Sequence, residues 1–168
     1  METYRYLDSP LGPLLLAGRG EILQHIFIPR EKEKANPDSS WVETDDCLVE
    51  AARQLTAYFS GSLETFSLQL DPQGTDFQKK VWGALQSIPF GKTISYGQLA
   101  MNISQPTASR AVGMANGKNP IPIIIPCHRV IGQDGSLTGF SSGLAAKRLL
   151  LKLEQNPEGK SGEQLGLF

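Results

Sequence analysis

The sequence predicts an α+β protein in two parts: a small N-terminal domain of strands with one helix, and a mainly helical C-terminal domain that contains a helix-turn-helix. Two observations predict this division. Short apolar runs of strand length fill the first part of the chain, whereas helical periodicity with capping residues dominates after residue 74. An Asp-Pro-Gln-Gly run at 71–74 is typical of a boundary. We therefore expect domains at 1–74 and 75–155, followed by a flexible tail at 156–168.

Three strands are expected in the N-terminal part, over residues 4–7, 14–17 and 22–28. Each is a short run rich in aliphatic and aromatic side chains, as is typical of strands. Residues 9–13 read Ser-Pro-Leu-Gly-Pro, a composition that favours a turn between the first two strands. The N-terminal part is thus expected to begin with strands joined by turns.

A helix is expected next, over residues 48–59, because its apolar residues recur at helical spacing. Thr44 precedes this run as the expected N-cap. The charged, proline-containing segment 31–40 is expected to be a loop. Apolar and polar residues then alternate over 66–70, which predicts a last strand before the boundary.

Capping boxes predict two helices at the start of the C-terminal part. Thr75 and Gln78 have the spacing in which side chain and backbone cap each other, and an apolar stripe follows them. Ser95 and Gln98 repeat this pattern and are expected to open a short helix that ends near Met101. An Ile-Pro-Phe-Gly turn separates the two helices.

Pro106 is well placed as the first residue of a further helix, over residues 106–115. With the short helix before it, this segment forms a helix-turn-helix pattern. Around Arg110, over residues 106–113, nearly all residues are small, a composition that suits close approach to a narrow DNA groove and also suits tight packing inside the protein. A last helix is expected over 143–154, with four leucines on or near its buried side: Leu144, Leu150, Leu151 and Leu153.

Composition and charge limit the class of protein. The chain of 168 residues is 40% hydrophobic and 20% charged, which is ordinary for a globular protein. Residues 1–75 carry six Lys/Arg against twelve Asp/Glu, whereas residues 76–168 carry ten against five, so only the second part is expected to meet a polyanion. Two distant cysteines do not suggest disulfides. With no signal-peptide core and no membrane-spanning run, we expect a cytoplasmic protein.

Cys127 and His128 are adjacent and follow the apolar run Ile-Pro-Ile-Ile-Ile-Pro. Free cysteine has a pKa near ~8.5, and a neighbouring imidazolium lowers it, so this pair favours a reactive thiolate. A lone cysteine after such a run is also typical of a hydrophobic core. Both interpretations stay open on these residues alone.

Four segments, in order, resemble the O6-alkylguanine-DNA alkyltransferases. They are residues 88–96 (Ile-Pro-Phe-Gly-Lys-Thr-Ile-Ser-Tyr), 110–113 (Arg-Ala-Val-Gly), 119–120 (Asn-Pro) and 126–130 (Pro-Cys-His-Arg-Val). Their spacing matches the family over roughly residues 76–154, whereas the N-terminal part resembles it only in length and in its strands and helix. The resemblance implies a ribonuclease-H-like N-terminal domain and a C-terminal domain that binds the minor groove of double-stranded DNA, in a monomer.

The resemblance also implies roles in the reaction. Cys127 is the acceptor, whose sulfur takes the alkyl group from guanine O6. His128 is the base that removes the thiol proton through a water, and Glu154 orients the imidazole and stabilises the imidazolium. Tyr96 donates to N3 of the leaving guanine. Asn119 supports the turn that holds the cysteine.

A further implied set of residues contacts DNA and the extrahelical base. Arg110 fills the space that the base leaves when it is flipped out of the duplex. Small residues around it let the helix enter the minor groove; they are Ala108, Ser109, Ala111 and Gly113. Ser141 reaches O6, and the backbone carbonyl of Val130 reads the exocyclic amine.

No cofactor and no metal are expected. A thioether is stable in water, so each molecule is expected to react once, with O6-alkylguanine as the substrate and O4-alkylthymine as a second candidate. Only Cys47 and His25 could ligate zinc in the N-terminal part, far short of a tetrahedral set. Two alternatives remain: a thiol hydrolase that uses Cys127 and His128, and a non-catalytic protein that recognises alkylated bases.

The tail after Glu154 is polar and rich in Gly and Pro, as is typical of a flexible linker. It ends in Gln164-Leu165-Gly166-Leu167-Phe168, which resembles the pentapeptide that binds the bacterial sliding clamp. A sliding clamp is therefore an expected partner. The alternative is that these last apolar residues fold back onto the core.

Overall fold

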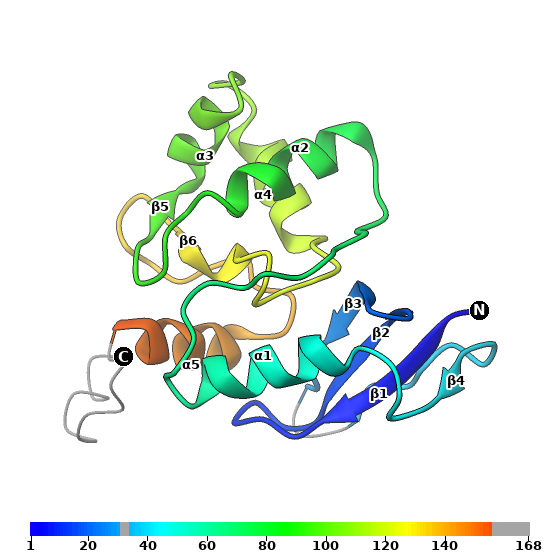
Figure 1. The fold of residues 1–168 in the computed structure, drawn as a ribbon. Helices are drawn as coiled ribbons and strands as arrows, with labels where there is room; N and C mark the ends of the chain where they lie inside the picture. The colour runs from blue at the N-terminus through cyan, green and yellow to red at the C-terminus, as the bar shows by residue number, and fades with distance from the viewer. Residues whose placement is uncertain (31–33, 156–168) are drawn as a thin grey trace. The chain divides into compact units, whose positions relative to one another are not determined.

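The computed structural model describes residues 1–30 and 34–155, and the chain divides into two units, Met1–Gln73 and Gly74–Phe168 (Figure 1). The first unit contains a sheet and one helix, and the second is mainly helical, which confirms the predicted α+β class. Within the described ranges, none of the helices combines the length and the apolar character that crossing a bilayer requires.

The first unit is built on a four-stranded sheet in the order β3-β2-β1-β4. Its strands are β1 (Thr3–Leu7), β2 (Leu14–Arg19), β3 (Ile22–Phe27) and β4 (Val42–Glu43). The three long strands form an antiparallel meander, and β4 pairs in parallel with β1. β2 supplies the centre of the core, because its first five residues are buried. The two-residue β4 had no recognisable signal in the sequence.

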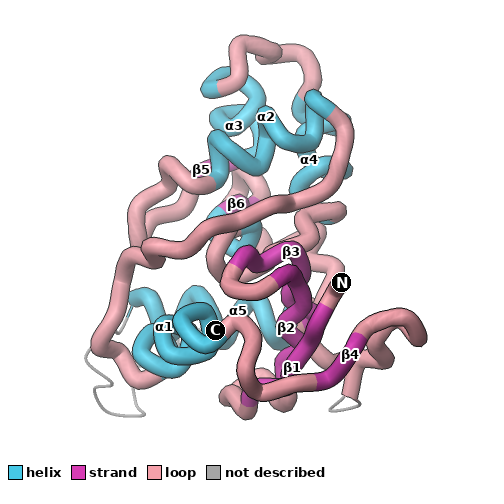
Figure 2. Tube along the Cα trace, turned by 45° about the vertical axis from the view of Figure 1, so that its right-hand side comes forward, coloured by secondary structure: helices cyan, strands magenta, loops and turns pink. Residues whose placement is uncertain are grey.

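Helix α1 (Val49–Phe59) lies beside this sheet (Figures 1 and 2). Thr44 is not its N-cap, because the helix begins only after Leu48, which has φ 52°. The carboxylate of Glu21, from the turn between two strands, accepts hydrogen bonds from the first two helical N–H groups at 3.0 and 2.9 Å. A negative charge at the N-terminus of a helix also interacts favourably with the positive end of the helix dipole. The prediction failed because this cap is distant in sequence.

Residues 66–70 do not form the expected strand; only Leu70 makes a bridge, to Leu23. The side chain of Gln54 replaces the missing neighbour strand. Its amide accepts from the Ser67 N–H at 2.9 Å and donates to the Ser67 carbonyl at 3.2 Å. The Ser67 backbone is therefore satisfied by a helix side chain, and only the end of the segment pairs with the sheet, at Leu23.

In the second unit, α4 (Ser109–Gly117) packs against α2 (Asp76–Leu85) and α3 (Tyr96–Asn102) (Figure 1). The first predicted capping box is complete, and Ser95 caps α3 as expected, although the Gln98 side chain bonds within the helix instead. α4 begins three residues later than predicted, because Pro106 lies in a turn that precedes the helix.

Much of the chain between α4 and α5 is loop (Figure 2), interrupted by the 3₁₀ helix η1 (Cys127–Arg129) and the strand β6 (Val130–Ile131). β6 pairs in parallel with β5 (Ile94–Ser95). Helix α5 (Leu144–Gln155) buries a stripe at helical spacing: Ala146, Lys147, Leu150, Leu151 and Glu154. The expectation that Leu144 lies on the buried side is wrong, since it is 41% exposed.

Candidate active site

The segment that leads to Cys127 is buried throughout, from Ile121 to Pro126. Ile123 has φ 77°, a left-handed conformation that β-branched residues rarely adopt. Asn119 spans this turn: its side-chain amide donates to the Ile125 carbonyl at 2.7 Å, and its oxygen accepts from the Ile121 N–H at 3.0 Å. The strained turn is thus held from both ends by one side chain, which sets the position of the cysteine that follows.

Cys127 is buried, with 4% of its surface exposed. Burial raises its pKa to about 11, although Asn119 and the positive charge of Lys147 act in the opposite direction. The expected stabilisation of a thiolate by a neighbouring imidazolium is therefore wrong for the free protein. His128 does not supply the positive charge that this effect requires, because its ring is itself buried and that burial lowers its pKa.

His128 and Glu154 are joined by a hydrogen bond of 2.6 Å between Nε2 and Oε2, and both side chains are buried. The pKa of Glu154 is about 2: burial raises it, but hydrogen bonds and charge from His128 and Arg129 lower it more. Because the carboxylate is ionised, Nε2 must carry the proton that is shared in this bond. Nδ1 is then unprotonated, and it has no hydrogen-bond partner among the described residues. The geometry leaves His128 with one lone pair available as a base.

Arg129 is the first functional residue that sequence reasoning missed. It is 6% exposed, and its guanidinium donates to both oxygens of Glu154, at 2.8 and 3.0 Å, in a bidentate pair. It also donates to the Ile88 carbonyl at 2.7 Å. The only sequence signal was its place beside Cys127 and His128. Arg129 fixes the carboxylate that in turn fixes the imidazole.

The Ile-Pro-Phe-Gly turn is tied to the same carboxylate. The Gly91 N–H donates to Glu154 Oε1 at 3.3 Å, and the Phe90 ring lies 5.8 Å from the Arg129 guanidinium carbon. Gly91 has φ 79°, which favours glycine. This turn therefore also contacts Glu154 and its partner Arg129.

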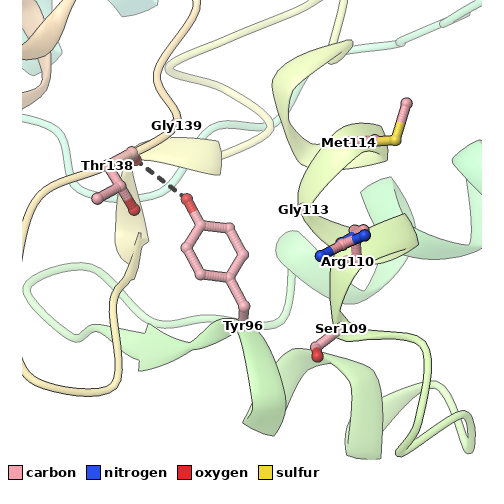
Figure 3. Close-up of a pocket in the computed structure, with 7 residues that line it drawn as sticks. All are labelled: Tyr96, Ser109, Arg110, Gly113, Met114, Thr138 and Gly139. Atoms are coloured by element: carbon pink, nitrogen blue, oxygen red, sulfur yellow. Dashed lines mark hydrogen bonds between the residues drawn. The ribbon is translucent and has the colours of Figure 1, made fainter.

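Tyr96 reaches the cysteine segment because β5 pairs with β6: Ile94 lies opposite Val130, and Tyr96 begins the helix that follows β5. Its hydroxyl donates to the Thr138 carbonyl at 3.0 Å (Figure 3). A Cβ at Gly139, where φ is 66°, would lie 2.7 Å from the Tyr96 hydroxyl oxygen. Only glycine therefore allows the loop to pass so close to the tyrosine.

A pocket of about 490 Å³ opens beside Tyr96 (Figure 3), a size typical of small-molecule sites. It is lined by Tyr96, Ser109, Arg110, Gly113, Met114, Thr138 and Gly139. A second pocket, of about 540 Å³, shares Gly113, Thr138 and Gly139 with the first and includes Ser141. The structure thus brings Tyr96, the α4 residues and Ser141 to two adjoining pockets.

The exposed residues of α4 are Ser109, Arg110, Ala111 and Met114, and Ala108 precedes the helix at intermediate exposure. Gly113 faces Tyr96, since a Cβ there would lie 3.7 Å from the ring. Arg110 is therefore exposed between the small residues Ser109 and Ala111, which excludes the alternative that its side of the helix packs inside the protein.

Lys147 is the second functional residue that sequence reasoning missed. It is fully buried, and its ammonium group donates to the carbonyls of Val130 and Thr138 at 2.6 and 2.7 Å. Burial lowers its pKa to about 8. The available sequence signal was the position of Lys147 and Glu154, which both fall on the apolar stripe of one helix. Lys147 links the cysteine segment to the loop that receives Tyr96.

The described residues contain no cluster of three or more His, Cys, Asp or Glu side chains that could hold a metal ion. Cys47, in the first unit, is buried, and its thiol donates to the Thr44 carbonyl at 3.3 Å.

Comparisons with known proteins match both units. The family model described as "6-O-methylguanine DNA methyltransferase, ribonuclease-like domain" matches residues 3–72, and the corresponding "DNA binding domain" matches residues 76–156. The chain is 54% identical over 151 residues to a methylated-DNA–protein-cysteine methyltransferase of Methanosarcina acetivorans, covering 90% of this chain and 97% of the relative. It is 49% identical over 156 residues to that of Mycobacterium tuberculosis, covering 93% and 94%.

A solved structure agrees with these matches. The crystal structure of Mycobacterium tuberculosis OGT in complex with DNA is similar with a TM-score of 0.88 and 46% identity, covering 98% of this chain and 99% of that chain. Sequence and fold therefore lead to one conclusion: the chain belongs to the methylated-DNA–protein-cysteine methyltransferase family.

Proposed function

We propose that Cys127 is the acceptor in a DNA-repair reaction that moves a methyl group from O6-methylguanine in DNA to the protein itself. The observation that carries this assignment is the buried series Cys127, His128 and Glu154, in which one imidazole nitrogen is fixed by the carboxylate and the other has no partner among the described residues. This is the order nucleophile, base and orienting group.

In the proposed step, a sulfur–carbon bond forms while the carbon–O6 bond breaks in line with it. The thiol proton passes to His128 Nδ1, directly or through a water, and the Glu154 carboxylate stabilises the imidazolium. The leaving guanine takes up one proton from the Tyr96 hydroxyl, and the proton that His128 received is returned to Tyr96 through solvent, so atoms and charge balance. Because burial raises the thiol pKa to about 11, the cysteine stays protonated at neutral pH until the substrate meets it.

Tyr96 is the proposed donor to the leaving guanine, at N3. Its hydroxyl already acts as a donor, to the Thr138 carbonyl, and its ring borders the pocket. Burial raises its pKa, which keeps the proton on the hydroxyl at neutral pH. Ser141, in the adjoining pocket, is the proposed contact to O6, and the Val130 carbonyl, which accepts from Lys147, is the proposed acceptor for the exocyclic amine.

DNA is the proposed partner of the exposed side of α4, and this helix is proposed to enter the minor groove. The small residues Ser109 and Ala111 beside Arg110 permit a close approach, and Arg110 is long enough to fill the gap that a flipped base leaves. The excess of basic residues in the second part of the chain supports the same assignment. O4-alkylthymine remains a second candidate substrate.

Sliding-clamp binding is a separate proposal, made on Gln164, Leu165, Leu167 and Phe168, which lie outside the described residues. A clamp pull-down with and without residues 164–168 tests it, and equal retention of both forms would remove it. We further propose that the protein acts as a monomer in the cytoplasm.

The reaction is tested with a duplex that carries one O6-methylguanine. We expect the intact mass of the protein to increase by one methyl group, the modified peptide to contain Cys127, and the yield to stop at one methyl per molecule. Methyl on Cys47, or no methyl, would contradict the assignment. Continued turnover on an ester or amide substrate would favour the thiol hydrolase instead.

Lys147→Met is expected to weaken both the fold and the reaction. Two buried carbonyls lose their donor, which should lower the free energy of unfolding by about 1–3 kcal/mol. Methyl transfer should slow by about 10- to 100-fold, because the loop that receives Tyr96 is no longer tied to the cysteine segment. Urea unfolding and single-turnover transfer measure the two effects. Arg148→Met, at an exposed position of the same helix, is the matched control and should change neither; equal behaviour of both variants would contradict this role.

A further inference from the structure

Met114 is a large apolar side chain that the proposed reaction leaves without a role. It is 67% exposed, and isolated exposed apolar residues are common on protein surfaces. Met114 differs from such isolated residues because it lines the same pocket as Tyr96 (Figure 3). Met101, on α3, is similarly exposed at 60% and does not line that pocket.

The helix places Met114 one turn after Arg110, on the same side of α4. Figure 3 shows both residues on the α4 side of the pocket, with Thr138 and Gly139 on the other side of Tyr96. The exposed residues of α4 are Ser109, Arg110, Ala111 and Met114. Among them, only Met114 offers a flexible apolar side chain to a bound molecule.

The exposure of the residues around this pocket indicates how a nucleotide would be oriented in it. Cys127 is buried and does not line this pocket, whereas Tyr96 lines it at intermediate exposure, so we place the reacting base on the Tyr96 side of the pocket. The sugar and its phosphates remain outside, since they are covalently continuous with the strand. Exposed Met114 lies at this outer end. The apolar C–H surface of a deoxyribose is a suitable contact for a polarizable thioether.

We propose that Met114 is a nucleotide-contacting residue, whose side chain packs against the deoxyribose of the nucleotide that is turned out of the duplex. The inference rests on the proposed function and deepens it, because it assigns recognition of the sugar to one side chain. Met114 contributes to capture of the extrahelical nucleotide and takes no part in the bond changes at sulfur.

The test compares a duplex that contains O6-methylguanine with the free base O6-methylguanine, which has no sugar. With duplex at concentrations below saturation, Met114→Ala should lower the single-turnover rate by about three- to tenfold, as expected for loss of partial burial of this side chain. The rate at saturating duplex should be unchanged. The reaction with the free base, followed by the mass of the Cys127 peptide, should also be unchanged.

Two further variants define the effect. Met114→Leu keeps an apolar side chain of similar volume and should retain the wild-type rate with duplex. Met101→Ala, at the matched exposed methionine, should behave as wild type with both substrates. An equal loss with duplex and free base, or no loss with duplex, would overturn the proposal. Failure of the proposed function is distinguishable, since the wild-type protein itself would then leave Cys127 unmethylated with both substrates.

Discussion

Cys127→Ala is expected to abolish methyl transfer while leaving the protein folded and able to bind DNA. The sulfur is the atom of the proposed site that forms the new bond to carbon. Its thiol is buried and, with a pKa of about 11, uncharged at neutral pH, so alanine removes no ion pair. DNA is proposed to contact the exposed residues of α4, which are unchanged. Transfer of a labelled methyl group and a mobility-shift assay on the same duplex measure the two properties.

Cys47→Ala is the matched control for this prediction. Cys47 is also buried, in the first unit, so both variants remove a buried thiol and should cost similar, small amounts of stability, about 1 kcal/mol. Cys47→Ala should retain full transfer. Methylation of the Cys127→Ala protein, or loss of its DNA binding together with transfer, would contradict the assigned role.

Local signals predicted the parts of the fold that depend on local interactions. The Thr75–Gln78 capping box forms both of its hydrogen bonds, and α2 begins where it predicts. The Thr44 cap failed, since Glu21 supplies that interaction from another turn. The expected strand over 66–70 failed for a related reason: a strand needs a neighbour, and Gln54 takes the place of one.

The candidate site was partly predictable for the same physical reasons. Adjacent Cys127 and His128 indicate a thiol beside a base, but adjacency does not determine the protonation state. That state depends on burial and on Glu154, which is 26 residues away. The β5–β6 pair that brings Tyr96 to the site is too short to leave a periodic pattern. Lys147 escaped notice because a lysine is ordinarily placed on the exposed side of a helix.

Glu154→Gln is expected to slow methyl transfer by about 10²–10⁴-fold and to destabilise the protein. The neutral amide cannot stabilise the imidazolium of His128, and general-base catalysis of this kind contributes rate factors of that order. It also leaves the buried Arg129 cation without its carboxylate, which typically costs about 3–5 kcal/mol. Single-turnover transfer at a temperature where the variant is folded, and urea unfolding, measure the two effects.

The pH dependence of unfolding tests whether Glu154 stabilises the fold through its charge or through its shape. Its pKa is about 2 in the folded protein against an ordinary value of 4.5, so the unfolded chain takes up the proton first. The stabilisation is therefore complete above pH 4.5 and is lost as pH falls toward about 2. Burial also lowers the pKa of His128 below 6.5, which adds a loss of stability as pH falls below that value. Glu154→Gln should lack the first of these two losses.

A second substitution separates catalysis from stability. In Glu154→Gln/Arg129→Met, no charge is left unpaired at this position, so the free energy of unfolding should recover most of what the single variant loses. Transfer should stay slow, because neither substitution restores the negative charge that stabilises the His128 imidazolium. Recovery of the rate together with the stability would mean that Glu154 acts only by holding the fold. Slow transfer in a stable double variant would assign the carboxylate to the reaction itself, through the one imidazole nitrogen that it binds.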